Sequence, residues 1–147
     1  MSKMESKLED TQILSIRLAA EQARIHAYAP YSKFRVGSAV MDAEGMIHPG
    51  CNVENAAYGS TICAERTALT AAIAQGVRSG DFRGLAVIAD TPEPITPCGA
   101  CRQVIVELCP GDMPVWFGNI RGTWREVKVR DLLPGAFTKE VLKGEGF

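Results

Sequence analysis

The sequence lacks any apolar run long enough to cross a membrane. Its uninterrupted apolar stretches extend over only a few residues, whereas a membrane-spanning helix needs about 20. The first ten residues are polar and charged and contain no apolar segment of the kind that a signal peptide carries. We therefore expect neither a membrane partner nor secretion.

The sequence also lacks an excess of positive charge. Lysine and arginine number 16 against 17 aspartates and glutamates, the net charge is −1, and no dense basic cluster is present. Because nucleic-acid binding depends on many cationic contacts with phosphates, we expect no nucleic-acid partner. Internal repeats and low-complexity linkers are missing as well. A chain of 147 residues without them predicts one domain, residues 11–147, after a flexible N-terminal extension, residues 1–10.

Cysteine is present in an odd number. The five cysteines are Cys51, Cys63, Cys98, Cys101 and Cys109. An odd count without an export signal is typical of a reducing compartment, in which neighbouring thiols bind metals or do redox work. We therefore expect a cytoplasmic protein.

Local patterns predict helices alternating with strands. Apolar residues at helical spacing predict a helix over 12–29 that ends before Pro30. Period-2 alternation over 34–41 and a returning strand over 46–53 predict a hairpin. The other predicted elements are an Ala-rich helix over 63–75, a strand over 85–89 covered on both faces, a helix over 98–110, a second hairpin over 115–117 and 124–129, and short helical pieces at 132–133 and after 137. This order indicates the α/β class, as a three-layer αβα sandwich around a mixed five-stranded sheet.

Two cysteine clusters carry the main functional signal. The first is Cys63-Ala64-Glu65, and the second is Pro97-Cys98-Gly99-Ala100-Cys101. Three thiols are one too few for a closed tetrahedral zinc shell, and a catalytic zinc keeps one position open for water or substrate. Glu65 lies two residues from the first thiol, where it can move protons beside that position. The pattern matches the zinc-deaminase signature H-x-E…P-C-x-x-C, with a cysteine in place of the histidine.

A zinc ion with three thiolates carries a net negative charge, which makes its water less acidic than on a zinc with neutral ligands. Arg66 lies three residues after Cys63 and therefore on the same helical face. We expect it to donate hydrogen bonds to ligand sulfurs and to offset that charge.

Two other interpretations compete with a catalytic zinc. A C-x-x-C pair alone fits a redox dithiol, but that interpretation leaves the first cluster unused. A structural zinc needs a fourth ligand from Cys51, Cys109, His26 or His48. Cys109 lies about 12 Å along the same predicted helix and is too distant. Cys51 remains the serious competitor, whereas both histidines are expected at the surface or in helix packing. We favour the catalytic zinc.

Beyond these clusters, the sequence resembles the small homotetrameric cytidine deaminases with a three-cysteine zinc site. The resemblance extends from residue 27 onward through the blocks 28–37, 50–58, 63–68, 97–103 and 132–137. It implies zinc on Cys63, Cys98 and Cys101, with Glu65 as the proton shuttle. It also implies a homotetramer whose sites are completed by neighbouring subunits. The substrate-binding residues that it implies are Phe34 against the pyrimidine, Asn52 and Glu54 on the ribose hydroxyls, Val53, Tyr58, the Ala64 backbone and Phe137.

The residues themselves agree with part of this assignment. Asn52 and Glu54 are two apart at a strand end, so their side chains share one face, and both can bind hydroxyls. Without the zinc clusters, we would favour a turn cap for Asn52 and a solvated Glu54. For Phe34, the strand pattern alone indicates core packing and substrate contact equally well.

The predicted reaction is hydrolytic deamination of cytidine and deoxycytidine to uridine and deoxyuridine, with release of ammonia. Glu65, with its pKa moved toward neutrality by burial, would take a proton from water and protonate N3 and the leaving amine. Two alternatives stay open: deamination of another small molecule that contains cytosine, and a zinc-stabilised structural module.

Overall fold

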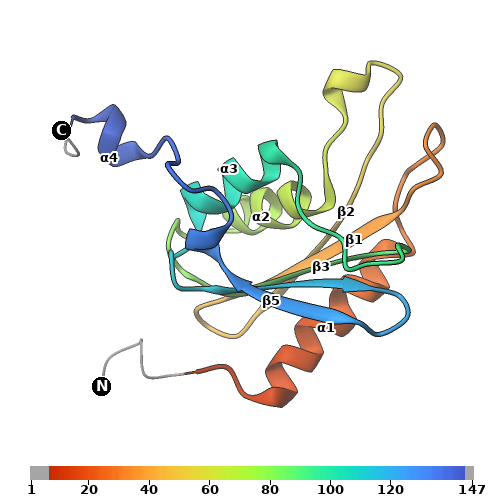
Figure 1. Cartoon of the computed structure of the whole chain (residues 1–147), viewed down its shortest axis with the longest axis horizontal. Helices are drawn as coiled ribbons and strands as arrows, with labels where there is room; N and C mark the ends of the chain where they lie inside the picture. The colour runs from red at the N-terminus through yellow and green to blue at the C-terminus, as the bar shows by residue number, and fades with distance from the viewer. Residues whose placement is uncertain (1–6, 145–147) are drawn as a thin grey trace.

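A mixed five-stranded sheet forms the middle layer of the computed structural model, which describes residues 7–144 (Figure 1). The strands are β1 (Val36–Asp42), β2 (Ile47–Cys51), β3 (Phe82–Ala89), β4 (Pro114–Asn119) and β5 (Trp124–Lys128), in the order β2-β1-β3-β4-β5. Strands β3 and β4 are parallel, and the other neighbours are antiparallel. The predicted α/β class and mixed five-stranded sheet are confirmed.

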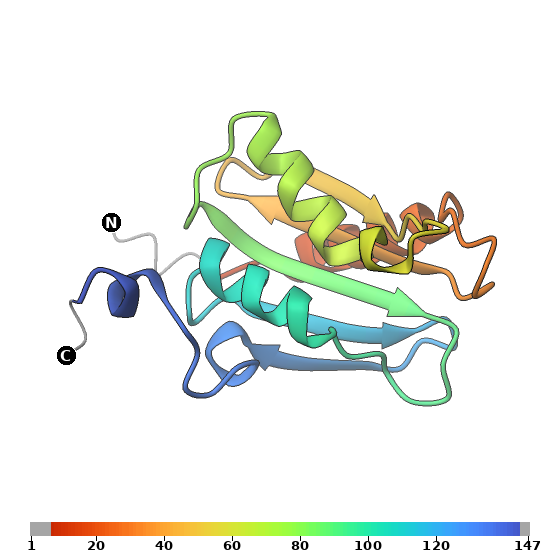
Figure 2. The same cartoon turned by 90° about the horizontal axis from the view of Figure 1, so that it is seen from above.

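Helices cover both faces of this sheet. Helix α1 (Asp10–Arg24) lies on one face, and α2 (Ala64–Ala74) and α3 (Gly99–Leu108) lie side by side on the other (Figure 2). Three short helices complete the described residues: η2 (Tyr58–Ser60), η3 (Val129–Asp131) and α4 (Lys139–Leu142). Across residues 7–144, none of the helices combines the length and apolar character that crossing a membrane requires.

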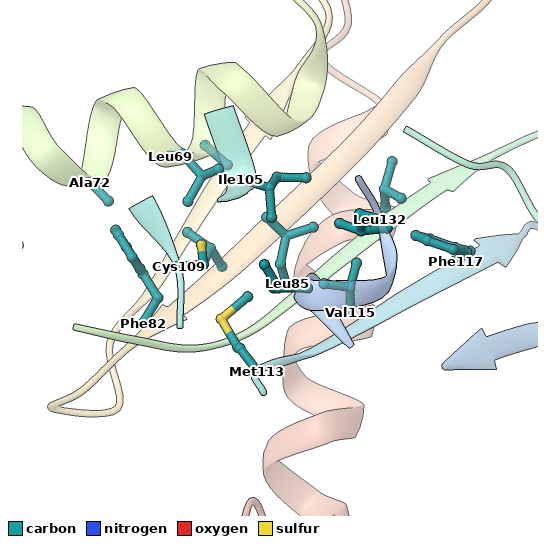
Figure 3. Packing of buried hydrophobic residues seen from close by; sticks show 14 residues of the cluster. Leu69, Ala72, Phe82, Leu85, Ile105, Cys109, Met113, Val115, Phe117 and Leu132 are labelled. Carbon is teal, nitrogen blue, oxygen red and sulfur yellow. The ribbon is translucent and has the colours of Figure 1, made fainter. Parts of the chain in front are cut away.

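Strand β3 has both faces buried, as its continuous apolar run predicts. Leu85 packs in the cluster beneath α2 and α3 (Figure 3), and Val87 belongs to the same cluster. Ala86 and Ile88 pack in the cluster beneath α1. The strand begins three residues earlier than predicted and includes Gly84. A β-carbon on this glycine would lie 2.7 Å from Cζ3 of Trp116, so the glycine allows the indole to pack against the strand.

The first helix ends at Arg24 and not at residue 29 as predicted. The reason is a tertiary pairing of Tyr28. Its N–H donates to the Asn52 carbonyl at 3.0 Å, and its carbonyl accepts from the Glu54 N–H at 2.8 Å. The segment after α1 therefore lies beside the end of the first hairpin. The N–H groups of residues 25–27 donate within turns, and that of Tyr28 donates to the hairpin.

The other boundaries differ from prediction by a few residues. Both hairpins are present, but β1 and β2 cover 36–42 and 47–51, where 34–41 and 46–53 were predicted. Cys63 and Cys98 have extended backbones and act as N-caps, so α2 and α3 each begin one residue after the predicted start. Of the predicted extension, residues 1–6 lie outside the described residues, while Leu8 packs against the α1-side cluster.

The connections place both cysteine clusters at one end of the sheet. Residues 52–62 lead from β2 to α2, and 90–98 lead from the end of β3 to α3, which returns the chain to the parallel strand β4. Both helices therefore start at the end of the sheet where β3 finishes (Figure 2). In open α/β sheets, this edge of the parallel strands is the usual place for a ligand site.

Candidate functional site

Helix α2 begins directly after Cys63. The preceding residue, Ile62, pairs with Val53 through backbone hydrogen bonds of 2.9 and 3.0 Å. This pairing fixes an extended entry, and the Ala-rich sequence that follows favours the helix. The thiol of Cys63 is therefore at the N-terminal end of α2, where the helix dipole and unpaired N–H groups favour a thiolate.

Helix α3 repeats this arrangement with Cys98 as its N-cap. The Cys101 N–H donates to the Cys98 Sγ at 3.5 Å, so the thiol takes the place of a capping oxygen. Pro97, buried just before it, fixes the entry of the chain. The i, i+3 spacing brings Cys98 and Cys101 to one side of the first turn.

The three thiols form a donor set that fits zinc. The sulfur atoms of Cys63, Cys98 and Cys101 all lie within 4.8 Å of one another. A tetrahedral zinc with Zn–S bonds of about 2.3 Å separates its sulfurs by about 3.8 Å, and the Sγ atoms of Cys63 and Cys98 are 3.7 Å apart. The chemistry of three thiolates, together with this separation, is what zinc requires.

The thiols are electrostatically unequal. Hydrogen bonding with the Cys101 thiol lowers the pKa of Cys63 to about 5, against the opposing effect of burial, with help from Arg66 and Cys98. The pKa of Cys101 is raised by its hydrogen bond with Cys63, by burial and by the charge of Glu65. Arg66 donates from Nη2 to the Cys63 Sγ at 3.4 Å. A guanidinium therefore touches the cluster, as expected from the i+3 spacing.

Glu65 is buried in the first turn of α2, with only 4% of its surface exposed. Burial raises the pKa of its carboxyl to about 7, which the charge of Cys63 reinforces. A carboxyl whose pKa lies near neutral pH can both take up and release a proton. It lies two residues from Cys63 and close enough to Cys101 to affect that thiol's pKa.

The proposed fourth ligands of a structural zinc do not join the cluster. Among residues 7–144, the group of side chains able to hold a metal consists of the three thiols alone. Cys51 lies in β2 opposite Gly37, and Cys109 is buried at the end of α3. His26 is exposed as expected, but His48 is buried and its Nε2 lies 2.9 Å from Asp42 Oδ2. The Asp42 carboxylate is buried as well, and its contact with the imidazole holds His48 inside the fold.

Asn52 and Glu54 lie at this same end of the sheet but have protein partners. The Asn52 Oδ1 accepts from the Val36 N–H at 2.9 Å, and its Nδ2 donates to the Phe34 carbonyl at 2.8 Å. One donor hydrogen and one lone pair of the amide remain. Glu54 accepts from the backbone and hydroxyl of Ser32 and from the Tyr31 N–H.

Several predicted substrate-binding side chains are exposed, whereas Ala64 is buried beside the cysteines. They belong to a larger exposed set, here called the loop patch, which covers segments 28–34 and 53–62. Its members are Tyr28, Tyr31, Phe34, Val53, Tyr58 and Ile62. Within it, the rings of Tyr31 and Tyr58 meet edge to face at 6.1 Å. Phe137 is separate from the patch, on the segment before α4, and is 59% exposed.

Two residues beside the cysteines had no role in the sequence analysis. Arg102 donates from Nε to the Pro97 carbonyl at 2.9 Å and from Nη1 to the Leu132 carbonyl at 2.8 Å. Gln103 donates to the Phe137 carbonyl at 2.8 Å. They tie the ligand loop to the C-terminal segment. The sequence carries a signal for Arg102: a cation near the N-terminus of a helix interacts unfavourably with the helix dipole, so a specific partner for it can be expected.

Ser32 is a third residue that sequence reasoning missed. Its hydroxyl accepts from the Phe34 N–H at 3.0 Å and donates to Glu54. A serine two residues before an N–H that it binds is an ordinary turn pattern, so the first contact could have been predicted. The second contact joins residues 22 apart and has no local signal.

Comparisons with known proteins agree with this geometry. A family model described as the cytidine and deoxycytidylate deaminase zinc-binding region matches residues 10–116. The chain is 56% identical over 123 residues to a cytidine deaminase of Sporosarcina psychrophila, covering 84% of this chain and 89% of that protein. It is 54% identical over 121 residues to one of Halalkalibacterium halodurans, covering 82% and 90%.

Solved structures agree as well. The crystal structure of a cytidine deaminase from Burkholderia pseudomallei has a TM-score of 0.83 at 50% identity, with 84% of this chain and 98% of that chain covered. A cytidine deaminase structure from Mycobacterium tuberculosis has a TM-score of 0.73 at 36% identity, with 88% and 98% covered. By sequence, by fold and by its three-thiol site, the chain belongs to the cytidine and deoxycytidylate deaminase family.

Proposed function

We propose that the protein deaminates cytidine and deoxycytidine by hydrolysis, giving uridine or deoxyuridine and ammonia. The observation that carries this proposal is the buried carboxyl of Glu65, which lies two residues from Cys63, one of three thiols grouped as a zinc site requires. The names of relatives more than 50% identical, cytidine deaminases, support the choice of substrate.

Cys63, Cys98 and Cys101 would hold the zinc, leaving its fourth position open. When bound, zinc supplies Lewis acidity that makes water a nucleophile at neutral pH. Arg66 contributes positive charge and a hydrogen bond at 3.4 Å to the Cys63 sulfur. This contact offsets part of the charge that three thiolates bring into the site.

Glu65 moves the protons in this proposal. Its carboxylate takes a proton from the attacking water and passes it to N3 of the base as C4 becomes tetrahedral. The same carboxylate then takes the remaining proton from the new hydroxyl on C4 and gives it to the amine, which leaves as ammonia while C4 becomes a carbonyl. Because this carboxyl is buried, it exchanges protons with the bound substrate and not with bulk water.

The remaining side chains bind the substrate. Asn52 offers its free donor hydrogen and lone pair, and Glu54 its free lone pair, to the sugar hydroxyls. Phe34 presents a half-exposed ring for the pyrimidine. Val53, the Ala64 backbone, Tyr58 and Phe137 complete the pocket around the nucleoside.

We further propose that four chains assemble and that neighbours complete each site. The loop patch and Phe137 support this proposal, because monomeric proteins rarely leave contiguous apolar patches of this kind uncovered. Tyr58, for example, is 76% exposed in the single chain. We place the protein in the cytoplasm, since all five of its cysteines are free thiols and a reducing compartment keeps them so.

The test is cytidine turnover followed by ultraviolet absorbance, with zinc measured per chain. We expect about one zinc per chain, held by the three-thiol donor set. A chelator should abolish turnover of both nucleosides, and added zinc should restore it. Zinc-loaded protein that leaves cytidine and deoxycytidine unchanged would contradict the proposed function.

A further inference from the structure

The segment before β1 has a backbone turn of uncommon geometry. Lys33 has a φ of 60° and is the non-glycine residue with positive φ among those described, a conformation that few non-glycine residues adopt. Its N–H donates to the Ala29 carbonyl at 3.0 Å. Ser32 and Phe34, on either side of it, are therefore held in fixed relation to each other.

Glu54 is the group on which this segment converges. Its Oε1 accepts from the N–H groups of Tyr31 at 3.0 Å and Ser32 at 3.1 Å. Its Oε2 accepts from the hydroxyl of Ser32. A carboxylate has about four lone-pair positions, so these contacts leave one, on Oε2, and the Ser32 hydroxyl determines where it points.

The same hydroxyl reaches Phe34. The Phe34 N–H donates to the Ser32 Oγ at 3.0 Å, while the Phe34 carbonyl accepts from Asn52 at 2.8 Å. One serine oxygen thus connects the carboxylate of Glu54 to the backbone that carries the Phe34 ring.

We propose that Ser32 is a positioning residue of the sugar subsite, orienting the single free lone pair of Glu54 toward the nucleoside hydroxyl. This inference rests on the proposed function, in which Glu54 accepts from the sugar and Phe34 packs on the base. In this proposal Ser32 acts through Glu54 and not by contact with the base or the reacting atoms. Its effect therefore belongs to nucleoside binding and not to the proton transfers at Glu65.

The charge state of Glu54 agrees with this role. The hydrogen bond from the Ser32 side chain is the largest influence on Glu54 and, with the backbone N–H groups of Ser32 and Tyr31 and the nearby Lys33, it lowers the pKa of the carboxyl. Glu54 is then ionised at neutral pH and acts only as an acceptor.

The experiment compares Ser32→Ala with wild type and with Glu54→Gln in the zinc-loaded enzyme. Removing a hydrogen bond to a charged group should raise the KM for cytidine and the Kd for uridine about tenfold, with kcat almost unchanged. Binding of the free base cytosine, which has no sugar, should change little. Ser32→Thr keeps the hydroxyl and should restore both constants. Ser79→Ala is the matched control, because Ser79 bonds the Glu107 carbonyl in another region.

A double-variant cycle separates positioning from loop stability. If Ser32 acts through Glu54, Ser32→Ala should add nothing to KM or Kd when Glu54 is already glutamine. An equal rise in both backgrounds would overturn the proposal, and so would an unchanged KM in the single variant. Ser32→Cys, with a weaker donor, should give an intermediate rise and serves if the alanine variant folds poorly. Loss of all turnover in wild type would instead count against the proposed function.

Discussion

Glu65 is buried in the first turn of α2, close enough to the thiols of Cys63 and Cys101 to interact with them electrostatically. An amide in its place has nearly the same shape but cannot take up a proton. We therefore expect Glu65→Gln to retain zinc while kcat falls by about a hundredfold or more, the usual contribution of a general acid–base group. The measurement is cytidine turnover with zinc quantified in the same sample.

The matched control is Glu44→Gln, an exposed glutamate in the turn between β1 and β2. It should leave both values unchanged. A Glu65→Gln enzyme with a near-normal rate would remove Glu65 from proton transfer.

At the scale of residues, the spacing of the cysteines was sufficient to predict which side chains could hold a metal. Three ligands, a nearby carboxylate and an arginine at i+3 follow from local geometry, and the structure brings the three sulfurs together. The partners of Asn52 and Glu54 could not be predicted. Both side chains bind backbone groups of segment 31–36, and this segment reaches them only through the tertiary fold.

Close contact between α2 and the first hairpin depends on Gly50 in β2. A β-carbon there would lie 2.4 Å from the Ala68 nitrogen and 2.6 Å from the Ala64 carbonyl oxygen. These are backbone atoms, so the helix itself would have to move. We expect Gly50→Ala to lower the free energy of unfolding by about 1–3 kcal/mol, the usual cost of overpacking. Urea unfolding in the presence of a chelator measures this change apart from metal binding.

Gly59→Ala is the control for that experiment, because a β-carbon at Gly59 meets nothing within 4 Å. Equal stability of the Gly50 and Gly59 variants would show that α2 tolerates displacement.

Tertiary contacts also explain why the types of the elements were easier to predict than their ends. The helical pattern of residues 12–29 continues past Arg24, but pairing of Tyr28 with Asn52 and Glu54 stops the helix there.

The assembly is the prediction that belongs to the whole molecule. We expect light scattering to give a particle of four times the 15.9 kDa chain mass, because the loop patch and Phe137 leave large apolar side chains uncovered. Ile62→Lys adds a charge to the patch and should shift the particle toward smaller species. Met46→Lys, on a side chain in the β1–β2 turn that is 62% exposed against 44% for Ile62, should not. A wild-type monomer at high concentration would contradict the assembly.

The layered architecture was predictable from the order of the elements, since a buried strand between two helices on one face leaves few arrangements. The sheet order was not, because nothing local shows that β3 pairs with β1 on one side and with β4 on the other. Because β2 and β3 are both antiparallel to β1, they finish at the same end of the sheet, and the starts of α2 and α3 follow there.

The start of α2 has one more consequence. Its N-cap position is occupied by Cys63, whose side chain makes no capping hydrogen bond to the helix, whereas serine, threonine or aspartate would supply an oxygen and about 1 kcal/mol of helix stability. The residue that best stabilises the fold and the residue that best binds the metal are therefore different at position 63. Directed evolution that ranks zinc-free variants by melting temperature would favour an oxygen there, and each such gain in heat resistance would cost the enzyme a metal ligand.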